Sequence, residues 1–135
     1  MIKHLRLKAY GKINLGLDVI RRRPDGYHEV KMIMQTVRLY DQIEMTRGGA
    51  PGIRLSTNLY YLPDNENNLG YRAARLLMEE FGVQEGLSIK IHKCIPVAAG
   101  MAGGSSDAAA VLYGVNRMFG LGLSLGQLME RGGSL

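Results

Sequence analysis

The sequence predicts a single α+β domain in which helices pack on a mostly antiparallel sheet. In the first half of the chain, apolar and polar residues alternate with a period of two, which is typical of half-buried strands. From residue 69 onwards, apolar residues recur mainly at helical spacing, interrupted by one further alternating segment. A chain of 135 residues is long enough for one domain with its own core.

Strands are expected wherever the alternation is regular. These segments are residues 5–9, 13–19, 30–39, 42–46, 53–55 and 87–91. Pro24, Asp25 and Gly26 predict a turn, because proline presets φ and the other two tolerate a tight backbone. The glycine-rich residues 48–52 predict a loop, after which residues 53–55 are expected to form a short return strand.

Helices are expected over three segments. The first covers residues 69–81, and either Asn67 or Asn68 can cap its start. The second covers residues 108–119 and follows a glycine-rich loop. Ser124 is a suitable N-cap for the third.

Composition excludes several classes of protein. Hydrophobic residues make up 46% and charged residues 21%, which indicates a globular chain rather than a disordered one. The apolar stretches are shorter than the ~18 residues that a membrane span needs, and the N-terminus lacks the apolar core of a signal peptide. The single cysteine, Cys94, permits no internal disulfide and no cysteine-based metal site. We therefore expect a cytoplasmic protein without a membrane partner.

Positive charge is concentrated in the first part of the chain. Residues 1–54 contain eleven Lys and Arg against five Asp and Glu, whereas the remainder contains six against seven. This asymmetry suggests an anionic partner, either nucleic acid or a phosphorylated small molecule. Charge alone does not separate the two.

The most informative segment is the glycine- and serine-rich stretch 96–107, between an expected strand and an expected helix. Glycines let backbone N–H groups converge on an anion, and a helix N-terminus adds partial positive charge. The order of strand, loop and helix favours a phosphate site over a turn whose serine only caps the helix. The segment is neither a Walker A loop nor a dinucleotide fingerprint. Asp107 would repel a phosphate, so it either points away or helps to hold a metal.

This segment resembles the phosphate-binding motif of the GHMP kinases, which continues through Asp107 into two alanines. The resemblance implies a fold like the second domain of ribosomal protein S5. It also implies that residues 1–135 form an N-terminal ATP-binding domain, which uses ATP with Mg²⁺. The implied ATP-binding residues are Asn68, Lys93, Pro96, Gly100, Gly103, Gly104, Ser105 and Ser106. For Asn68 and Lys93, the alternatives are a helix cap and a solvated charge at a strand end.

Lys12 and Asn14 lie on the polar face of the expected strand 13–19 and its entry, where spacing alone predicts solvated residues. The stretch around them resembles the opening motif of the GHMP kinases that act on a cytidine-bearing methylerythritol. The resemblance implies that Lys12 is a catalytic residue at the phosphoryl acceptor and that Asn14 lines the same pocket. A lysine can polarise the acceptor hydroxyl and stabilise charge on the phosphoryl group.

Tyr27 and His28 offer a stacking face and a hydrogen-bonding edge, the two features that a nucleobase requires. An aromatic residue after a turn is more often simply packed. However, residues 23–28 resemble the segment of the same kinases that holds cytosine. The implied reaction is ATP-dependent phosphorylation of the 2-hydroxyl of 4-diphosphocytidyl-2-C-methyl-D-erythritol, a step of non-mevalonate isoprenoid precursor biosynthesis. The implied partners are this cytidine diphosphate substrate and ATP, not nucleic acid.

The resemblance covers most of the chain, but GHMP kinases of this kind are considerably longer. Their catalytic aspartate lies in a Gly-Ala/Ser-Asp-Val-Pro segment that does not occur in these 135 residues. Their C-terminal domain is also absent, so the chain is expected to be truncated relative to these kinases. A short gene, a shortened form of a longer protein and completion by a second chain all stay open. Two alternatives stay open: another GHMP small-molecule kinase, and a non-catalytic S5-like module that binds nucleotides or nucleic acid. Metal ligands and oligomeric state are not predicted.

Overall fold

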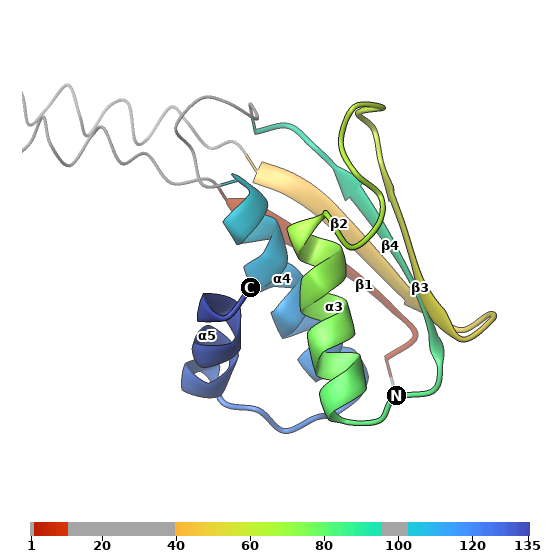
Figure 1. Cartoon of the computed structure of the whole chain (residues 1–135), viewed down its shortest axis with the longest axis vertical. Helices are drawn as coiled ribbons and strands as arrows, with labels where there is room; N and C mark the ends of the chain where they lie inside the picture. Colours follow the sequence, from red (N-terminus) through yellow and green to blue (C-terminus); the bar gives the residue numbers. More distant parts are fainter. Residues whose placement is uncertain (1, 11–39, 96–102) are drawn as a thin grey trace, which may run out of the picture.

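The structure, a computed structural model, describes residues 2–10, 40–95 and 103–135. Along the chain these residues form β1 (His4–Tyr10), β2 (Tyr40–Arg47), β3 (Gly52–Thr57), α3 (Leu69–Glu80), β4 (Gly86–His92), α4 (Gly103–Met118) and α5 (Leu125–Gly133). The helices lie together on one side of the sheet, so the predicted α+β fold is confirmed (Figure 1). The strands predicted over 13–19 and 30–39, and the turn at 24–26, lie outside the described residues.

The four described strands form one sheet in the order β1-β2-β4-β3. β2 pairs antiparallel with β1 and with β4, whereas β3 pairs parallel with β4. The prediction of a mostly antiparallel sheet is therefore confirmed. The short return strand expected at residues 53–55 is confirmed as part of β3, and it lies beside β4 rather than beside β2. Helix α3 connects β3 to β4, and parallel neighbours require a crossover of this kind.

The inward face of β2 carries a charged residue at each end. Asp41, Ile43, Met45 and Arg47 are all buried, as the period-two geometry of a strand requires. The middle pair joins the apolar core under the helices. The opposite face of the sheet stays polar. Because Asp41 and Arg47 are charged and buried on the inward face, they need partners inside the molecule.

Side-chain caps define the starts of α3 and α5. The Asn68 side chain accepts hydrogen bonds from the Gly70 and Tyr71 N–H groups, at 2.8 and 3.4 Å. Ser124 and Gln127 form a capping box at the start of α5. The predicted caps are confirmed, with Asn68 rather than Asn67 at α3.

Helix α4 starts earlier than the sequence pattern indicated. It begins at Gly103, so its first turn is formed by the glycines and serines that we assigned to the loop before residue 108. Ser105 and Ser106 both lie within the helix, and neither is its N-cap. Glycine and serine have weak helix propensity, but packing within a fold commonly overrides propensity.

The loop between β2 and β3 packs directly on Gly86, at the start of β4. A Cβ at this position would lie 2.1 Å from the Ala50 carbonyl oxygen and 2.5 Å from that of Gly48. We expect Gly86→Ala to lower the free energy of unfolding by about 2–3 kcal/mol, because overpacking against backbone forces the loop to move. Urea unfolding followed by circular dichroism measures the change.

Gly133→Ala is the matched control for this substitution, because a Cβ there meets nothing within 4 Å. It should change the free energy of unfolding by less than about 0.5 kcal/mol. Equal stability of the two variants would show that the loop on Gly86 yields without cost.

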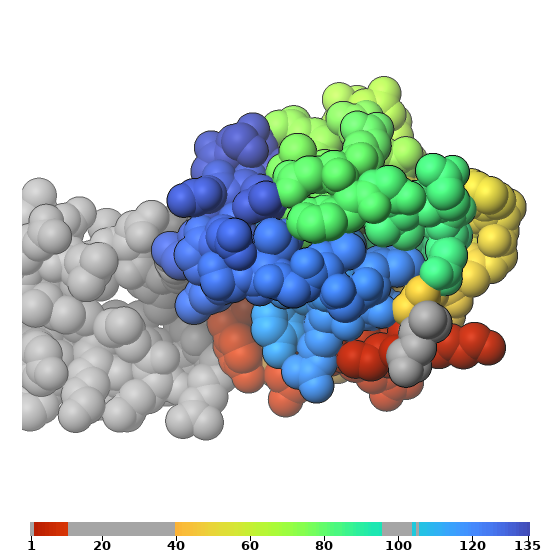
Figure 2. Space-filling view, turned by 90° about the horizontal axis from the view of Figure 1, so that it is seen from below, coloured from red at the N-terminus to blue at the C-terminus, as the bar shows by residue number. Residues whose placement is uncertain are grey.

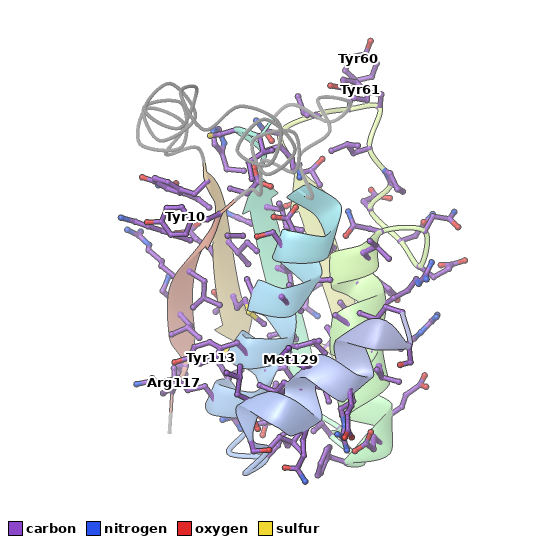
Figure 3. The ribbon with its side chains drawn as sticks, turned by 90° about the vertical axis from the view of Figure 1, so that its left-hand side faces the viewer. Tyr10, Tyr60, Tyr61, Tyr113, Arg117 and Met129 are labelled. Atoms are coloured by element: carbon purple, nitrogen blue, oxygen red, sulfur yellow. The ribbon has the colours of Figure 1, made fainter. Side chains whose placement is uncertain are left out.

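The helices pack against one another in a continuous layer (Figure 2). The outer side of this layer is partly apolar. A groove of about 390 Å³ lies between α4 and α5. Tyr113, Leu125 and Met129 line it, and the last two side chains are 72% and 69% exposed. Tyr113 and Met129 can be followed on this side of the molecule in Figure 3. No helix in the described part of the chain is long and apolar enough to cross a membrane.

Candidate functional site

One end of the domain brings together the segments that carry the predicted motifs. At this end β1 stops at Tyr10 and β2 starts at Tyr40, and these two residues pair with each other. β4 also ends here, and α4 begins here (Figure 1). Residues 11–39 and 96–102, which lie outside the described residues, therefore both connect to the described fold at this end.

A buried cluster of three charged side chains lies at this end. Lys93 Nζ donates a hydrogen bond to Asp41 Oδ2 at 2.7 Å and another to Asp107 Oδ2 at 2.8 Å. The side chains of Lys93, Asp41 and Asp107 are 7%, 0% and 5% exposed. The cluster joins the start of β2, the end of β4 and the second turn of α4.

The second carboxylate oxygen of Asp41 holds the chain that leaves β4. Asp41 Oδ1 accepts hydrogen bonds from the N–H groups of Cys94 and Ile95, at 2.7 and 3.0 Å. Asn58 pairs with the backbone of Lys93, accepting from its N–H at 2.7 Å and donating to its carbonyl at 3.2 Å. Residues 93–95 are thus held by side chains immediately before the glycine-rich segment.

The cluster shares a proton near neutral pH. Burial, followed by the hydrogen bond with Asp41, raises the pKa of Asp107 from 3.8 to about 7. Burial also acts to raise the pKa of Asp41, but hydrogen bonds from Asp107, Lys93 and two backbone N–H groups outweigh it and lower that pKa. The pKa of Lys93 is raised despite its burial, because it bonds to both carboxylates. The shared proton therefore resides on Asp107, and Lys93 stays charged.

The first turn of α4 is also tied to the sheet edge. The Ser106 hydroxyl donates a hydrogen bond to the Tyr10 carbonyl, the last residue of β1. The starts of α3 and α4 lie side by side, since a Cβ built at Gly104 would be 3.5 Å from Leu69 Cδ1. Two helix N-termini, each with partial positive charge, therefore face the same end of the domain, and the Asn68 side chain caps that of α3.

The structure describes six of the predicted site residues. Gly103, Gly104, Ser105 and Ser106 form the first turn of α4, and Asn68 caps α3 beside it. Lys93 follows β4, and its interpretation as a solvated charge is wrong because its side chain is buried between two aspartates. The remaining predicted residues, Lys12, Asn14, Tyr27, His28, Pro96 and Gly100, lie outside the described residues.

Asp41 and Asp107 are the residues that sequence reasoning missed or left open. Asp107 points at Lys93, and its Oδ1 is buried with no hydrogen-bond partner among the described residues. A signal for Asp41 was available, because it shares the inward face of β2 with Ile43 and Met45. A charged residue on an otherwise apolar strand face indicates a buried partner. In the described part of the chain, no group of three or more His, Cys, Asp or Glu side chains could hold a metal ion.

Solved structures of small-molecule kinases share this fold. Homoserine kinase from Cytophaga hutchinsonii superposes with a TM-score of 0.64 at 19% identity, over 70% of this chain and 31% of that one. A structure named 4-(cytidine 5'-diphospho)-2C-methyl-D-erythritol kinase superposes with a TM-score of 0.60 at 26% identity, over 95% of this chain and 46% of that one. The fold is thus that of a kinase domain of this class.

The family model described as "GHMP kinases N terminal domain" matches residues 68–135, and the chain belongs to this family. Several curated relatives bear the name 4-diphosphocytidyl-2-C-methyl-D-erythritol kinase, and two of them illustrate the similarity. The protein of Lachnoclostridium phytofermentans is 55% identical over 95% of this chain and 44% of its own length. That of Lachnospira eligens is 54% identical over 97% of this chain and 46% of its own length. The chain therefore spans about half the length of the relatives that it matches.

Proposed function

We propose that this chain is the ATP-binding part of a kinase that phosphorylates the 2-hydroxyl of 4-diphosphocytidyl-2-C-methyl-D-erythritol. The observation that carries the proposal is the identity of 54–55% to relatives of that name over 95–97% of the chain. The geometry supports it, because two helix N-termini and the glycine-rich segment meet at one end of the domain. The substrates are small molecules rather than nucleic acid, and the reaction belongs in the cytoplasm.

In this proposal the start of α4 binds the polyphosphate of ATP. The backbone N–H groups from Gly100 to Ser106 approach the phosphate oxygens closely, because glycine has no Cβ to obstruct them. Asn68 and Pro96 complete the nucleotide pocket around this turn. Mg²⁺ is proposed as a companion of ATP, since it is usually bound by one or two protein ligands together with the substrate phosphates. When bound, it neutralises charge on the phosphates.

The acceptor side of the proposed site is formed by residues 11–39. Lys12 polarises the acceptor hydroxyl and stabilises the charge of the phosphoryl group during its transfer, and Asn14 positions the same hydroxyl. Tyr27 stacks on the cytosine ring and His28 bonds to its polar edge. This segment joins the domain at Tyr10 and Tyr40, next to the start of α4, so both substrates can be held at one end.

Two substitutions should separate the two ligands in a direct binding assay such as calorimetry. Gly103→Val should abolish binding of Mg-ATP, because a branched side chain blocks the approach of the phosphate to the N–H groups. It should leave binding of the cytidine substrate unchanged.

Tyr27→Ala should weaken binding of the cytidine substrate by about tenfold or more, because stacking on an aromatic ring is worth ~1–3 kcal/mol per base. It should leave binding of Mg-ATP unchanged.

Homoserine and mevalonate serve as control ligands in the same assay. Binding of homoserine or mevalonate in place of the cytidine substrate would indicate that the chain belongs to a different GHMP kinase. Unchanged Mg-ATP binding by Gly103→Val would contradict the phosphate assignment. Loss of both ligands in either variant would indicate unfolding, which circular dichroism detects.

A further inference from the structure

The Asp41–Lys93–Asp107 cluster is more than an ion pair between neighbouring elements. It joins the two ends of the glycine-rich segment 96–107, because Lys93 comes three residues before the first residue of that segment and Asp107 is its last residue. Asp41 adds bonds to the N–H groups of Cys94 and Ile95. The separation between the end of β4 and the start of α4 is therefore set by directional bonds through one ammonium group.

Two of the three ammonium donors of Lys93 are already used in this arrangement, so a direct phosphate contact would have to compete with both aspartates. The Lys93 ammonium is buried and donates to the two carboxylates at 2.7 and 2.8 Å. With both aspartates ionised the cluster carries one net negative charge, and with Asp107 protonated it is neutral. An anion at the start of α4 favours the neutral form, because it repels the extra negative charge.

We infer that Asp41, Lys93 and Asp107 are positioning residues, which hold the first turn of α4 in place for the polyphosphate and do so best when Asp107 carries a proton. This inference rests on the proposed function, and it assigns Lys93 an indirect role in place of a phosphate contact. Among the described residues, Asp41 and Lys93 are the charged groups that act on Asp107. Ser106 beside it binds the Tyr10 carbonyl.

The alternative is that the cluster only stabilises the fold. Asp107→Asn and Asp107→Leu distinguish these roles. Asparagine reproduces the protonated aspartic acid, since its amide can donate to Asp41 while its oxygen accepts from Lys93. Leucine fills similar volume but forms neither bond. Arg47→Met is the matched control, because Arg47 is the other buried charge of β2, at the opposite end of that strand.

The experiment measures the affinity of the 135-residue chain and its folded variants for Mg-ATP by calorimetry at pH 6.5 and 8.5. We expect Asp107→Leu to weaken binding at least about tenfold, and Asp107→Asn and Arg47→Met to stay within about threefold of the wild type at pH 6.5. The wild-type affinity should fall by about fivefold or more between the two pH values, and that of Asp107→Asn should not. Ionisation of the nucleotide itself is common to all variants and cancels in this comparison.

Three outcomes would overturn the inference. The first is wild-type affinity in a folded Asp107→Leu protein. The second, which applies even if that variant does not fold, is the same pH dependence in the wild type and Asp107→Asn. The third is a loss in Arg47→Met as large as that in Asp107→Leu, which would show that the effect follows stability. Absence of Mg-ATP binding by the wild type would overturn the proposed function together with the inference, whereas the first three outcomes leave the proposed function intact.

Discussion

The 135-residue chain by itself should transfer phosphate to 4-diphosphocytidyl-2-C-methyl-D-erythritol at least about 10²–10⁴ times more slowly than a full-length relative. It spans only 44–46% of the relatives' length. It contains no Gly-Ala/Ser-Asp-Val-Pro segment, which the resemblance identifies as the carrier of the catalytic base. Asp41 and Asp107 are poor substitutes, because both are buried and bonded to Lys93. Orientation in an enclosed site supplies much of phosphoryl-transfer catalysis, so loss of enclosure adds to the deficit.

The measurement is ADP release with ATP, Mg²⁺ and the cytidine substrate, beside the full-length Lachnoclostridium phytofermentans protein. Binding of Mg-ATP to the same sample shows that the chain is folded. Lys12→Met identifies contaminating kinase activity, since turnover that survives this substitution does not come from the proposed site. Turnover within about tenfold of the relative would place the base among residues 1–135, and the role of Lys12 would then need revision.

Local patterns in the sequence predicted most of the described fold. Alternation identified β1, β2 and β4, and helical spacing with Asn68 and Ser124 as caps identified α3 and α5. These signals succeed because they depend on periodicity and on bonds between near neighbours in the chain. The position of β3 was not predictable in this way. Whether residues 53–55 pair with β2 or with β4 depends on the crossover through α3, which a pattern within one strand does not contain.

The candidate site shows the same limit. The glycine-rich segment was recognisable because its composition is unusual, and the structure adds that its last four residues form the first turn of α4. The partners of Lys93 were not recognisable, because Asp41 and Asp107 are 52 and 14 residues away from it along the chain. The only local sign was a charged residue on the inward face of a strand. Contacts between distant residues at one end of a sheet become visible only once the strand order is known.

Loss of the ammonium group from the buried cluster should strongly destabilise the protein. We expect Lys93→Met to lower the free energy of unfolding by about 3–5 kcal/mol at pH 8, the cost typical of removing one partner from a buried ion pair. Two carboxylates would then share the site without a cation. The loss should be smaller at pH 5, because a proton on Asp107 lets that group donate a hydrogen bond to Asp41 and removes one negative charge.

The sign of this pH dependence follows from the two shifted groups. Because the pKa of Asp107 is raised from 3.8 to about 7, its protonated form is favoured by folding. The stability that this proton contributes is full below about pH 3.8, is partly present at pH 5 and is lost as the pH rises through about 7. Because the pKa of Lys93 is also raised, Lys93 stays charged across this range and the wild type keeps its cation. Removal of that cation raises the pKa of Asp107 further, so the difference in unfolding free energy between Lys93→Met and the wild type should grow from pH 5 to pH 8.

Urea unfolding at both pH values measures this difference. Arg47→Met is the control. The hydrogen bond with Arg47 lowers the pKa of its half-exposed partner Glu85, so Glu85 stays ionised at pH 5 and at pH 8 and the loss of unfolding free energy should be the same at both. An equal loss for Lys93→Met at pH 5 and pH 8 would mean that Asp107 does not take up the proton.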